Sequence, residues 1–183
     1  MNVVSLYVGS SRRKEDNNMI KALVVSDSHG NSTYMKQVIK DEKPDMLIHA
    51  GDVEDSLYGI LGPVDFYIHV VKGNCDTFVD APLEEIFNLG KRKVLLIHGH
   101  MCGGAHIHPF NHMEEIVAYA KSKGCDMLIY GHTHIPDFEE REDGFIIVNP
   151  GSISRPRQID RQKTYAILEV KDDKVNVIQK SYD

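Results

Sequence analysis

The sequence predicts an α/β fold in which two packed β-sheets are flanked by helices. The first half of the chain alternates short apolar runs with helical patterns, an order typical of βαβ units. The second half consists mainly of strand-like segments joined by turns, which indicates antiparallel hairpins. The 183 residues contain no repeat, no low-complexity tract and no evident linker, so we expect one domain with a substantial core.

The N-terminal half provides three apolar strands, and a polar break follows each one. β-Branched residues dominate the first run, as in buried strands, and Asn31 or Ser32 can cap the helix that comes next. The pattern predicts, in order, strand 21–26, helix 33–41, strand 46–50, helix 55–61 and strand 66–72.

The C-terminal half reads as strand pairs around one longer helix. Apolar residues recur at helical spacing between 111 and 123, which predicts an amphipathic helix. Gly90, Asp143-Gly144 and Asp172-Asp173 mark tight turns. We expect strands over 85–89, 93–98, 127–130, 138–141, 145–149, 165–170 and 175–180.

Charge and composition exclude several classes of protein. A formal net charge of -6 argues against a protein that coats nucleic acid, although bound metal ions would let a short nucleotide bind. No apolar run approaches the ~20 residues that cross a bilayer. The three cysteines lack the paired spacing of a zinc site, so we expect a reduced, cytoplasmic setting.

The first 18 residues differ in character from the rest of the chain. Their weak apolar stretch precedes the charges, the reverse of a secretory signal. We therefore expect residues 1–18 to be a flexible extension and residues 19–183 to form the domain. Met19 begins the first strand-like segment, so it is a candidate for the true start of the protein.

Five predicted strands end in polar clusters, and a glycine adjoins each cluster. Loops at the carboxyl ends of strands in α/β sheets converge on one site. Carboxylate and amide oxygens together with imidazole nitrogens suit divalent ions such as Mn²⁺, Fe²⁺, Co²⁺, Ni²⁺ and Zn²⁺. Each cluster alone has an ordinary explanation as a turn, but their recurrence after successive strands predicts a metal centre built from Asp27, His29, Asp52, Asn74, His98, His132 and His134.

These motifs resemble the calcineurin-like metallophosphoesterase superfamily, and in particular its small YfcE-type phosphodiesterases. The resemblance rests on Asp27-x-His29, Gly51-Asp52, Gly73-Asn74, His98 and Gly131-His132-x-His134. It covers residues 19 to about 180 and implies a sandwich of two sheets between helices. It also implies a dinuclear-metal hydrolase that cleaves phosphodiesters by attack of a metal-bridging hydroxide, with Mn²⁺ as the expected ion and Ni²⁺, Co²⁺, Fe²⁺ or Zn²⁺ as alternatives.

The resemblance assigns each ligand to an ion. One ion would be held by Asp27, His29, Asp52 and His134. The other would be held by Asp52, Asn74, His98 and His132, so that Asp52 bridges the pair.

One position departs from the pattern of many superfamily members. Cys75 occupies the place where they carry a histidine that assists the leaving oxygen. A thiol is a weaker hydrogen-bond donor and lacks the charge of an imidazolium. We therefore expect Asn74, Asp76 and His100 to be the catalytic residues, with any acid supplied by Asp76, His100 or water, while Cys75 either contacts substrate or fills a loop.

Other polar residues have two interpretations each. Arg155 and Arg157 either grip a substrate phosphate or pair with surface carboxylates. Residues 101–112 form either a solvated loop or a lid. Asn149 to Ser152 follow a strand, and we expect them to position the turn at 131–134 through hydrogen bonds.

Two functions from different classes fit the sequence. The first is an enzyme that acts on a small phosphodiester. It would have no membrane partner and no stable nucleic-acid partner, and it would be either a monomer or a homo-oligomer. The second is a non-catalytic scaffold, because a retromer subunit has this fold. A scaffold can lose metal ligands without penalty, yet every ligand position is filled here, which favours the enzyme.

Overall fold

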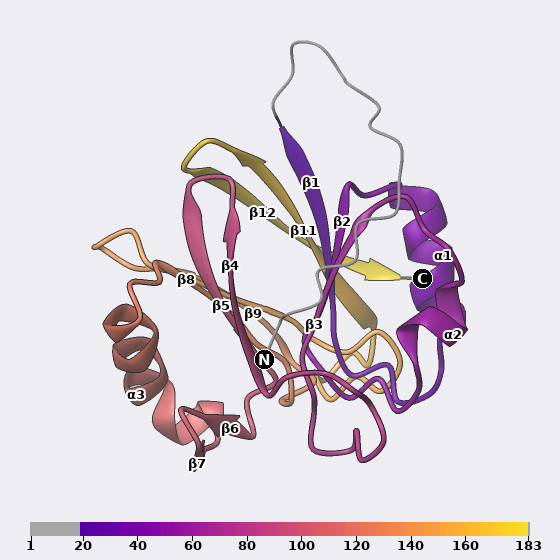
Figure 1. Cartoon of the computed structure of the whole chain (residues 1–183), viewed down its shortest axis with the longest axis horizontal. Helices are drawn as coiled ribbons and strands as arrows, with labels where there is room; N and C mark the ends of the chain where they lie inside the picture. The colour runs from indigo at the N-terminus through magenta and orange to yellow at the C-terminus, as the bar shows by residue number, and fades with distance from the viewer. Residues whose placement is uncertain (1–18, 183) are drawn as a thin grey trace.

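The computed structural model describes residues 19–182, so the expected extension over residues 1–18 lies outside the described residues. Two five-stranded sheets pack against each other, and helices cover their outer faces (Figure 1). The predicted sandwich of two sheets between helices is confirmed. Among residues 19–182, no helix is both long enough and apolar enough to cross a membrane.

The first sheet has the strand order β12-β11-β1-β2-β3. Its three N-terminal strands run parallel, and β11 pairs antiparallel with β1. Helices α1 (Thr33–Glu42) and α2 (Leu57–Leu61) make the crossovers, as predicted. The strands are β1 (Ile20–Val25), β2 (Met46–His49), β3 (Tyr67–Val70), β11 (Lys163–Lys171) and β12 (Lys174–Tyr182).

The second sheet has the order β4-β5-β8-β10-β9. The hairpins β4/β5 and β9/β10 confirm the predicted antiparallel pairs, but β5, β8 and β10 run parallel. Helix α3 (Pro109–Ser122) connects β5 to β8, so this half also contains a βαβ unit that the expectation of hairpins missed. The strands are β4 (Glu84–Leu89), β5 (Arg92–Ile97), β8 (Met127–Ile129), β9 (Pro136–Glu140) and β10 (Ile146–Pro150).

Alternation along the strands builds three apolar layers. Successive side chains of a strand point to opposite faces, so Val24 packs between the two sheets while Leu23 packs under the helices of the first sheet. In the second sheet, Leu95 and Leu128 face α3 in the same way. The sheets are therefore buried on both faces, and their strand ends are held in fixed positions.

The segment 101–112 is more ordered than the predicted loop. Strands β6 (Met101–Cys102) and β7 (Ala105–His106) form a small hairpin around two glycines with positive φ. Helix α3 then begins at Pro109, because proline suits the first turn of a helix and the His108 side chain accepts a hydrogen bond from the Phe110 N–H. The expectation of a loop over the whole segment was wrong.

Glu42 ties the end of α1 to the first sheet. Its carboxylate accepts hydrogen bonds from Lys21 (2.7 Å), Lys180 (2.8 Å) and the Tyr165 hydroxyl (2.8 Å). Burial alone would raise the pKa of Glu42, but the hydrogen bonds from these three residues lower it from 4.5 to about 2. A lowering of this size corresponds to about 3 kcal/mol of stability at neutral pH.

We expect Glu42→Gln to lower the free energy of unfolding by about 2–3 kcal/mol at pH 7. Because the folded pKa lies below the unfolded one, this stabilisation is complete above pH 4.5 and is lost as the pH falls towards 2. Urea denaturation at pH 7 and pH 3 measures it, and Glu140→Gln, at an exposed position, is the control. A difference in unfolding free energy between wild type and Glu42→Gln that is larger at pH 3 than at pH 7 would contradict this account.

Candidate metal centre

The proposed ligands occupy loops at the carboxyl ends of five strands, and the two sheets bring these ends together. Asp27 and His29 follow β1, Asp52 follows β2, and His132 and His134 follow β8. Backbone hydrogen bonds lock the loops to one another, including Asp27 N–H to the Gly51 carbonyl at 3.0 Å. The His132 N–H donates to Asp27 Oδ2 at 3.1 Å, which joins the first sheet to the second.

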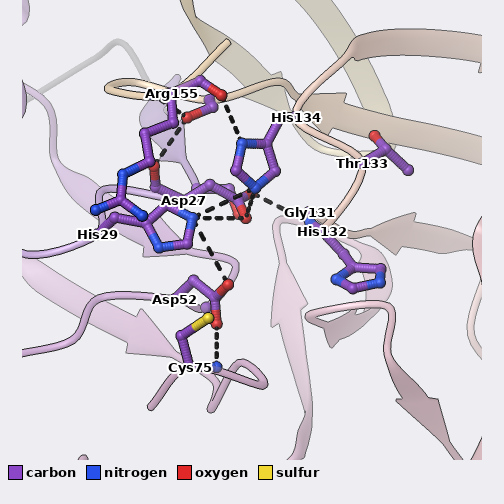
Figure 2. Close-up of polar contacts among 12 residues, drawn as sticks. Asp27, His29, Asp52, Cys75, Gly131, His132, Thr133, His134 and Arg155 are labelled. Carbon is purple, nitrogen blue, oxygen red and sulfur yellow. Dashed lines mark hydrogen bonds and ion pairs between the residues drawn. The ribbon is translucent and has the colours of Figure 1, made fainter. Parts of the chain in front are cut away.

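Asp27, His29 and His134 form one compact ligand group (Figure 2), in which one ligand atom from each lies within 4.8 Å of the others. His134 Nε2 lies 3.1 Å from Asp27 Oδ1, and the Nε2 atoms of His29 and His134 lie 3.3 Å apart. Asp27 Oδ1 is buried and has no hydrogen-bond partner in the part of the chain that the structure describes. A buried carboxylate oxygen without a donor is costly unless a cation takes its lone pair.

The contacts of the Nδ1 nitrogens of His29 and His134 explain why the Nε2 nitrogens of the two rings face each other. Nδ1 of His29 lies 2.5 Å from Glu54 Oε1, and Nδ1 of His134 lies 2.5 Å from the carbonyl oxygen of Arg155. Both partners are acceptors, so each Nδ1 carries the proton and each Nε2 presents a lone pair. Two lone pairs that face each other repel, and a divalent ion between them and Asp27 removes that conflict. The residues therefore fit a metal ion.

A second group places Asp52 and His98 beside Asp27. Nδ1 of His98 donates to the Ala50 carbonyl at 2.7 Å, while its Nε2 faces Asn74 Oδ1 at 3.1 Å and Asp52 Oδ2 at 3.4 Å. Burial would lower the pKa of His98, but Asp52 and Asp27 raise it above its ordinary value. The two carboxylates thus stabilise positive charge at His98, and a bound metal ion would supply positive charge to the same oxygens.

His132 lies on the His98 side of the centre. Its ring points away from Asp27, His29 and His134 in Figure 2, and its centroid is 5.0 Å from that of His98. Burial and the neighbouring His98 lower the pKa of His132 to about 4. The neutral imidazole is the form that binds metal ions. His132 belongs to neither compact group, so its place as a ligand stays a prediction.

Five of the seven proposed ligands have a left-handed backbone conformation, with positive φ values. This conformation is uncommon for residues other than glycine and costs on the order of 1 kcal/mol or more each. Strain of this kind persists only where the surroundings enforce it, and it gathers at functional sites. The five residues are Asp27 (55°), His29 (47°), Asp52 (56°), His132 (67°) and His134 (59°).

The end of β10 and the residues after it support the site, as predicted. The Asn149 amide donates to the Gly131 carbonyl and to Thr133 Oγ1, both at 3.0 Å, which fixes the turn at 131–134. Ser152 Oγ donates to the Asp27 carbonyl at 2.8 Å. Neither Asn149 nor Ser152 is exposed, so all three hydrogen bonds are protected from water.

Asp76 does not face the cleft. Its carboxylate is 1% exposed and accepts backbone N–H groups of Asp52 (2.8 Å), Glu54 (2.6 Å) and Gly73 (2.8 Å). These bonds hold the loop after β2 against the loop after β3. We expected Asp76 among the catalytic residues, but its position is that of a structural anchor that cannot reach a substrate.

Cys75 lies at the rim of the centre and is exposed. Its N–H donates to Asp52 Oδ1 at 2.8 Å, and the Asn74 amide donates to its sulfur at 3.3 Å. Burial and the charge of Asp52 raise the pKa of the thiol to about 11, so Cys75 remains a neutral thiol at physiological pH. Cys75 thus does not provide the positive charge that a histidine would bring here.

Glu54 is a site residue that the sequence did not reveal. Its carboxylate accepts the Nδ1 proton of His29, and its own backbone has a φ of 60°. A carboxylate behind a metal-binding histidine fixes the ring and makes it a better ligand. The only signal in the sequence is an acidic residue two positions after Asp52, and nothing there shows which histidine it would meet.

We expect Glu54→Gln to weaken Mn²⁺ binding about 10–100-fold, because His29 loses its charged partner. Calorimetric titration of the metal-depleted protein measures this affinity. Asp55→Asn, one residue further along and exposed, should leave it unchanged. Equal affinities for wild type and Glu54→Gln would show that Glu54 does not orient His29.

The remaining predicted site residues lie around the opening of the centre. His100 is half-buried with its ring centroid 5.4 Å from that of His98, and its Nδ1 has no hydrogen-bond partner among the described residues. Arg155 and Arg157 are exposed and line a cleft together with His29 and His134. The side chains of His100, Arg155 and Arg157 thus adjoin the proposed metal centre.

Comparison with known proteins supports a phosphoesterase. The chain is 34% identical over 161 residues to the probable metallophosphoesterase YsnB of Bacillus subtilis, covering 86% of this chain and 89% of that protein. It is 28% identical over 165 residues to the phosphodiesterase YfcE of Escherichia coli, covering 76% and 82%. A crystal structure of a predicted phosphoesterase from Streptococcus pneumoniae superposes with a TM-score of 0.74 at 30% identity, covering 89% of this chain and 90% of that one.

The fold is also that of Vps29, a vacuolar protein sorting protein. Vps29 from Cryptosporidium parvum superposes with a TM-score of 0.66 at 18% identity, covering 91% of this chain and 99% of that one. At this identity the likeness concerns the fold alone. The model of the calcineurin-like phosphoesterase superfamily domain matches residues 20–173. Together with the metal-ligand groups at the strand ends, this match shows that the chain belongs to the calcineurin-like phosphoesterase superfamily.

Proposed function

We propose that this protein is a phosphodiesterase that uses two divalent metal ions, with Mn²⁺ as the expected ion. The observation that carries the proposal is the approach of His29 Nε2 and His134 Nε2 to 3.3 Å beside Asp27 Oδ1, which has no hydrogen-bond partner among the described residues. The second group around Asp52 and His98 provides oxygen and nitrogen ligands for another ion. Asp52 lies between the groups, 3.7 Å from His29 Nε2 and 3.4 Å from His98 Nε2.

Two bound ions supply a water molecule activated for attack and positive charge that neutralises the phosphate. The chain itself orients these parts. Asp52 Oδ1 accepts the Cys75 N–H and His98 Nδ1 donates to the Ala50 carbonyl, so both ligand side chains keep a fixed direction. His100 lies beside His98, and because its unpartnered Nδ1 is buried, we expect any contact with a substrate oxygen to be made through Nε2.

The preference for diesters is supported by the relative YfcE, which is named a phosphodiesterase. The neutral Cys75 thiol provides no charged donor for a leaving oxygen, so we expect substrates with good leaving groups to react fastest. The substrate is a small phosphodiester in this proposal.

The scaffold alternative draws on the fold likeness to Vps29. Vps29 of Entamoeba histolytica has itself been solved in complex with Zn²⁺, so metal binding alone does not separate the two functions. The strained backbones of the buried ligands and Asp27 Oδ1, which has no hydrogen-bond partner among the described residues, support metal binding, which both functions allow. The enzyme is favoured because relatives named metallophosphoesterase or phosphodiesterase are 34% and 28% identical to this chain, against 18% for Vps29 of Cryptosporidium parvum.

The test compares hydrolysis of bis-p-nitrophenyl phosphate with that of p-nitrophenyl phosphate. The protein is first depleted of metal and then supplied separately with Mn²⁺, Ni²⁺, Co²⁺, Zn²⁺ or Mg²⁺. We expect no turnover without metal, restored turnover with Mn²⁺, and a higher kcat/KM for the diester. No turnover with any ion would favour the scaffold, and a higher kcat/KM for the monoester would refute the diester preference.

A further inference from the structure

Three arginines line the cleft that opens beside the proposed metal centre. Arg155, Arg157 and Arg161 surround a volume of about 400 Å³ together with His29 and His134. Clefts of this size hold small organic ligands, which are larger than a phosphate group alone. The cleft therefore has room for part of a substrate beyond the phosphate that is cleaved.

The three guanidinium groups have no carboxylate partner. Within residues 19–182, no Asp or Glu oxygen lies within 4.0 Å of the side-chain nitrogens of Arg155, Arg157 or Arg161. Asp160 lies on the same loop, but its carboxylate accepts the Gln162 N–H. In a chain with a net charge of -6, three adjacent unpaired cations are a specific arrangement that attracts an anion.

The backbone of this segment is fastened to a metal-ligand loop. The Arg155 carbonyl accepts the Nδ1 proton of His134, and the Arg157 N–H donates to the His134 carbonyl at 3.1 Å. Figure 2 shows the Arg155 side chain extending beside the His29 ring. One side-chain N–H of Arg161 donates to the Pro156 carbonyl at 3.0 Å, which is the only side-chain hydrogen bond of Arg161 within residues 19–182. The backbone that carries Arg155 and Arg157 is thus held at a fixed position relative to the metal centre.

We propose that Arg155, Arg157 and Arg161 form a subsite for a second phosphate group, so that the substrate is a phosphodiester that also carries a phosphate monoester. This inference rests on the proposed phosphodiesterase function. A diester phosphate carries one negative charge, which the two ions already neutralise. Guanidinium groups pair bidentately with phosphate, and the dianionic monoester group matches several of them.

The test uses two substrates with the same scissile bond and leaving group. These are thymidine 5′-(4-nitrophenyl phosphate) and its 3′-phosphorylated form. We expect the 3′-phosphorylated substrate to have a kcat/KM about tenfold higher or more, through a lower KM. In Arg157→Gln/Arg161→Gln this ratio should fall to about one, whereas Arg141→Gln, which loses a remote pair with Glu114, should keep it.

The outcomes separate the two proposals. Equal kcat/KM values for both substrates in the wild type would overturn the subsite and leave the phosphodiesterase standing. Turnover of neither substrate would refute the phosphodiesterase, and calorimetry of thymidine 3′,5′-bisphosphate with the full chain would still decide the subsite. We expect Arg157→Gln/Arg161→Gln to bind this compound at least about tenfold more weakly than wild type, and equal affinities would overturn the subsite.

Discussion

Asp52→Asn should lower phosphodiester hydrolysis by about 1,000-fold or more, because both proposed ions lose a shared anionic ligand. The Asn oxygen can still accept the Cys75 N–H that now reaches Oδ1. Its NH₂ group would then point at the Nε2 atoms of His29 and His98, which lie 3.7 and 3.4 Å from Oδ2. The variant therefore keeps the fold but presents donors where a metal ion must bind. Steady-state kinetics with bis-p-nitrophenyl phosphate and Mn²⁺ measures the loss.

Asp172→Asn is a matched control for this variant. Asp172 has nearly the same left-handed backbone, with φ of 58° against 56° for Asp52, but it lies in the exposed turn between β11 and β12. The substitution should leave turnover and metal binding unchanged. If Asp52→Asn retained more than about a tenth of the wild-type kcat/KM, the bridging role of Asp52 would be wrong.

Gly73→Ala should disrupt the same ligand by steric overlap. A Cβ at this position would lie 2.0 Å from Asp52 Oδ1 and 2.3 Å from the Asp52 backbone nitrogen. Both atoms are fixed, Oδ1 by the Cys75 N–H and the backbone nitrogen by Asp76, so the loops after β2 and β3 must separate. We expect a loss of about 3 kcal/mol in unfolding free energy and weaker Mn²⁺ binding, measured by urea denaturation and calorimetry.

The control for Gly73→Ala is another glycine-to-alanine change with open space. Gly59 lies in α2, where an added Cβ would meet nothing closer than 3.6 Å. Alanine is the better helix former, so Gly59→Ala should be neutral or stabilising. Wild-type stability and metal affinity in Gly73→Ala would show that the two loops can move apart freely, contrary to the close packing described above.

The proposed ligands are recognisable in the sequence because each one directly follows an apolar strand. Strand ends in an α/β protein meet at one edge, so Asp27, Asp52 and His98 can be assigned to a common site without knowing the strand order. The resemblance then divides the ligands between two ions. The elements of the first sheet were predictable for the same reason, since strong strand and helix patterns alternate there.

The features that could not be predicted from the sequence depend on contacts between residues that are far apart in the chain. The partner of His29 is Glu54, and the partner of Asp52 is the Cys75 N–H, and both depend on how separate loops meet. Asp76 resembles a catalytic acid in sequence, but burial and three N–H donors make it an anchor. The second sheet was predicted less well because its parallel pairing of β5 with β8 depends on the crossover through α3.

The same contacts connect the fold to the proposed chemistry. The strained backbones of three ligands are tolerated because other residues hold these ligands in place. Ser152 holds the Asp27 carbonyl, while Glu54 holds the His29 ring and the Arg155 carbonyl holds the His134 ring. The ligand geometry is thus set before an ion arrives, which lowers the cost of organising it on binding. Arg155 serves both purposes in this account, with its carbonyl on His134 and its guanidinium at the cleft.

The most direct measurement is a crystal structure of the Mn²⁺-loaded protein with anomalous scattering data collected at the manganese edge. We predict two anomalous peaks about 3.5–4 Å apart. One should lie among Asp27, His29 and His134, the other beside Asn74, His98 and His132, with Asp52 in contact with both. A single peak, or peaks away from these residues, would contradict the dinuclear centre.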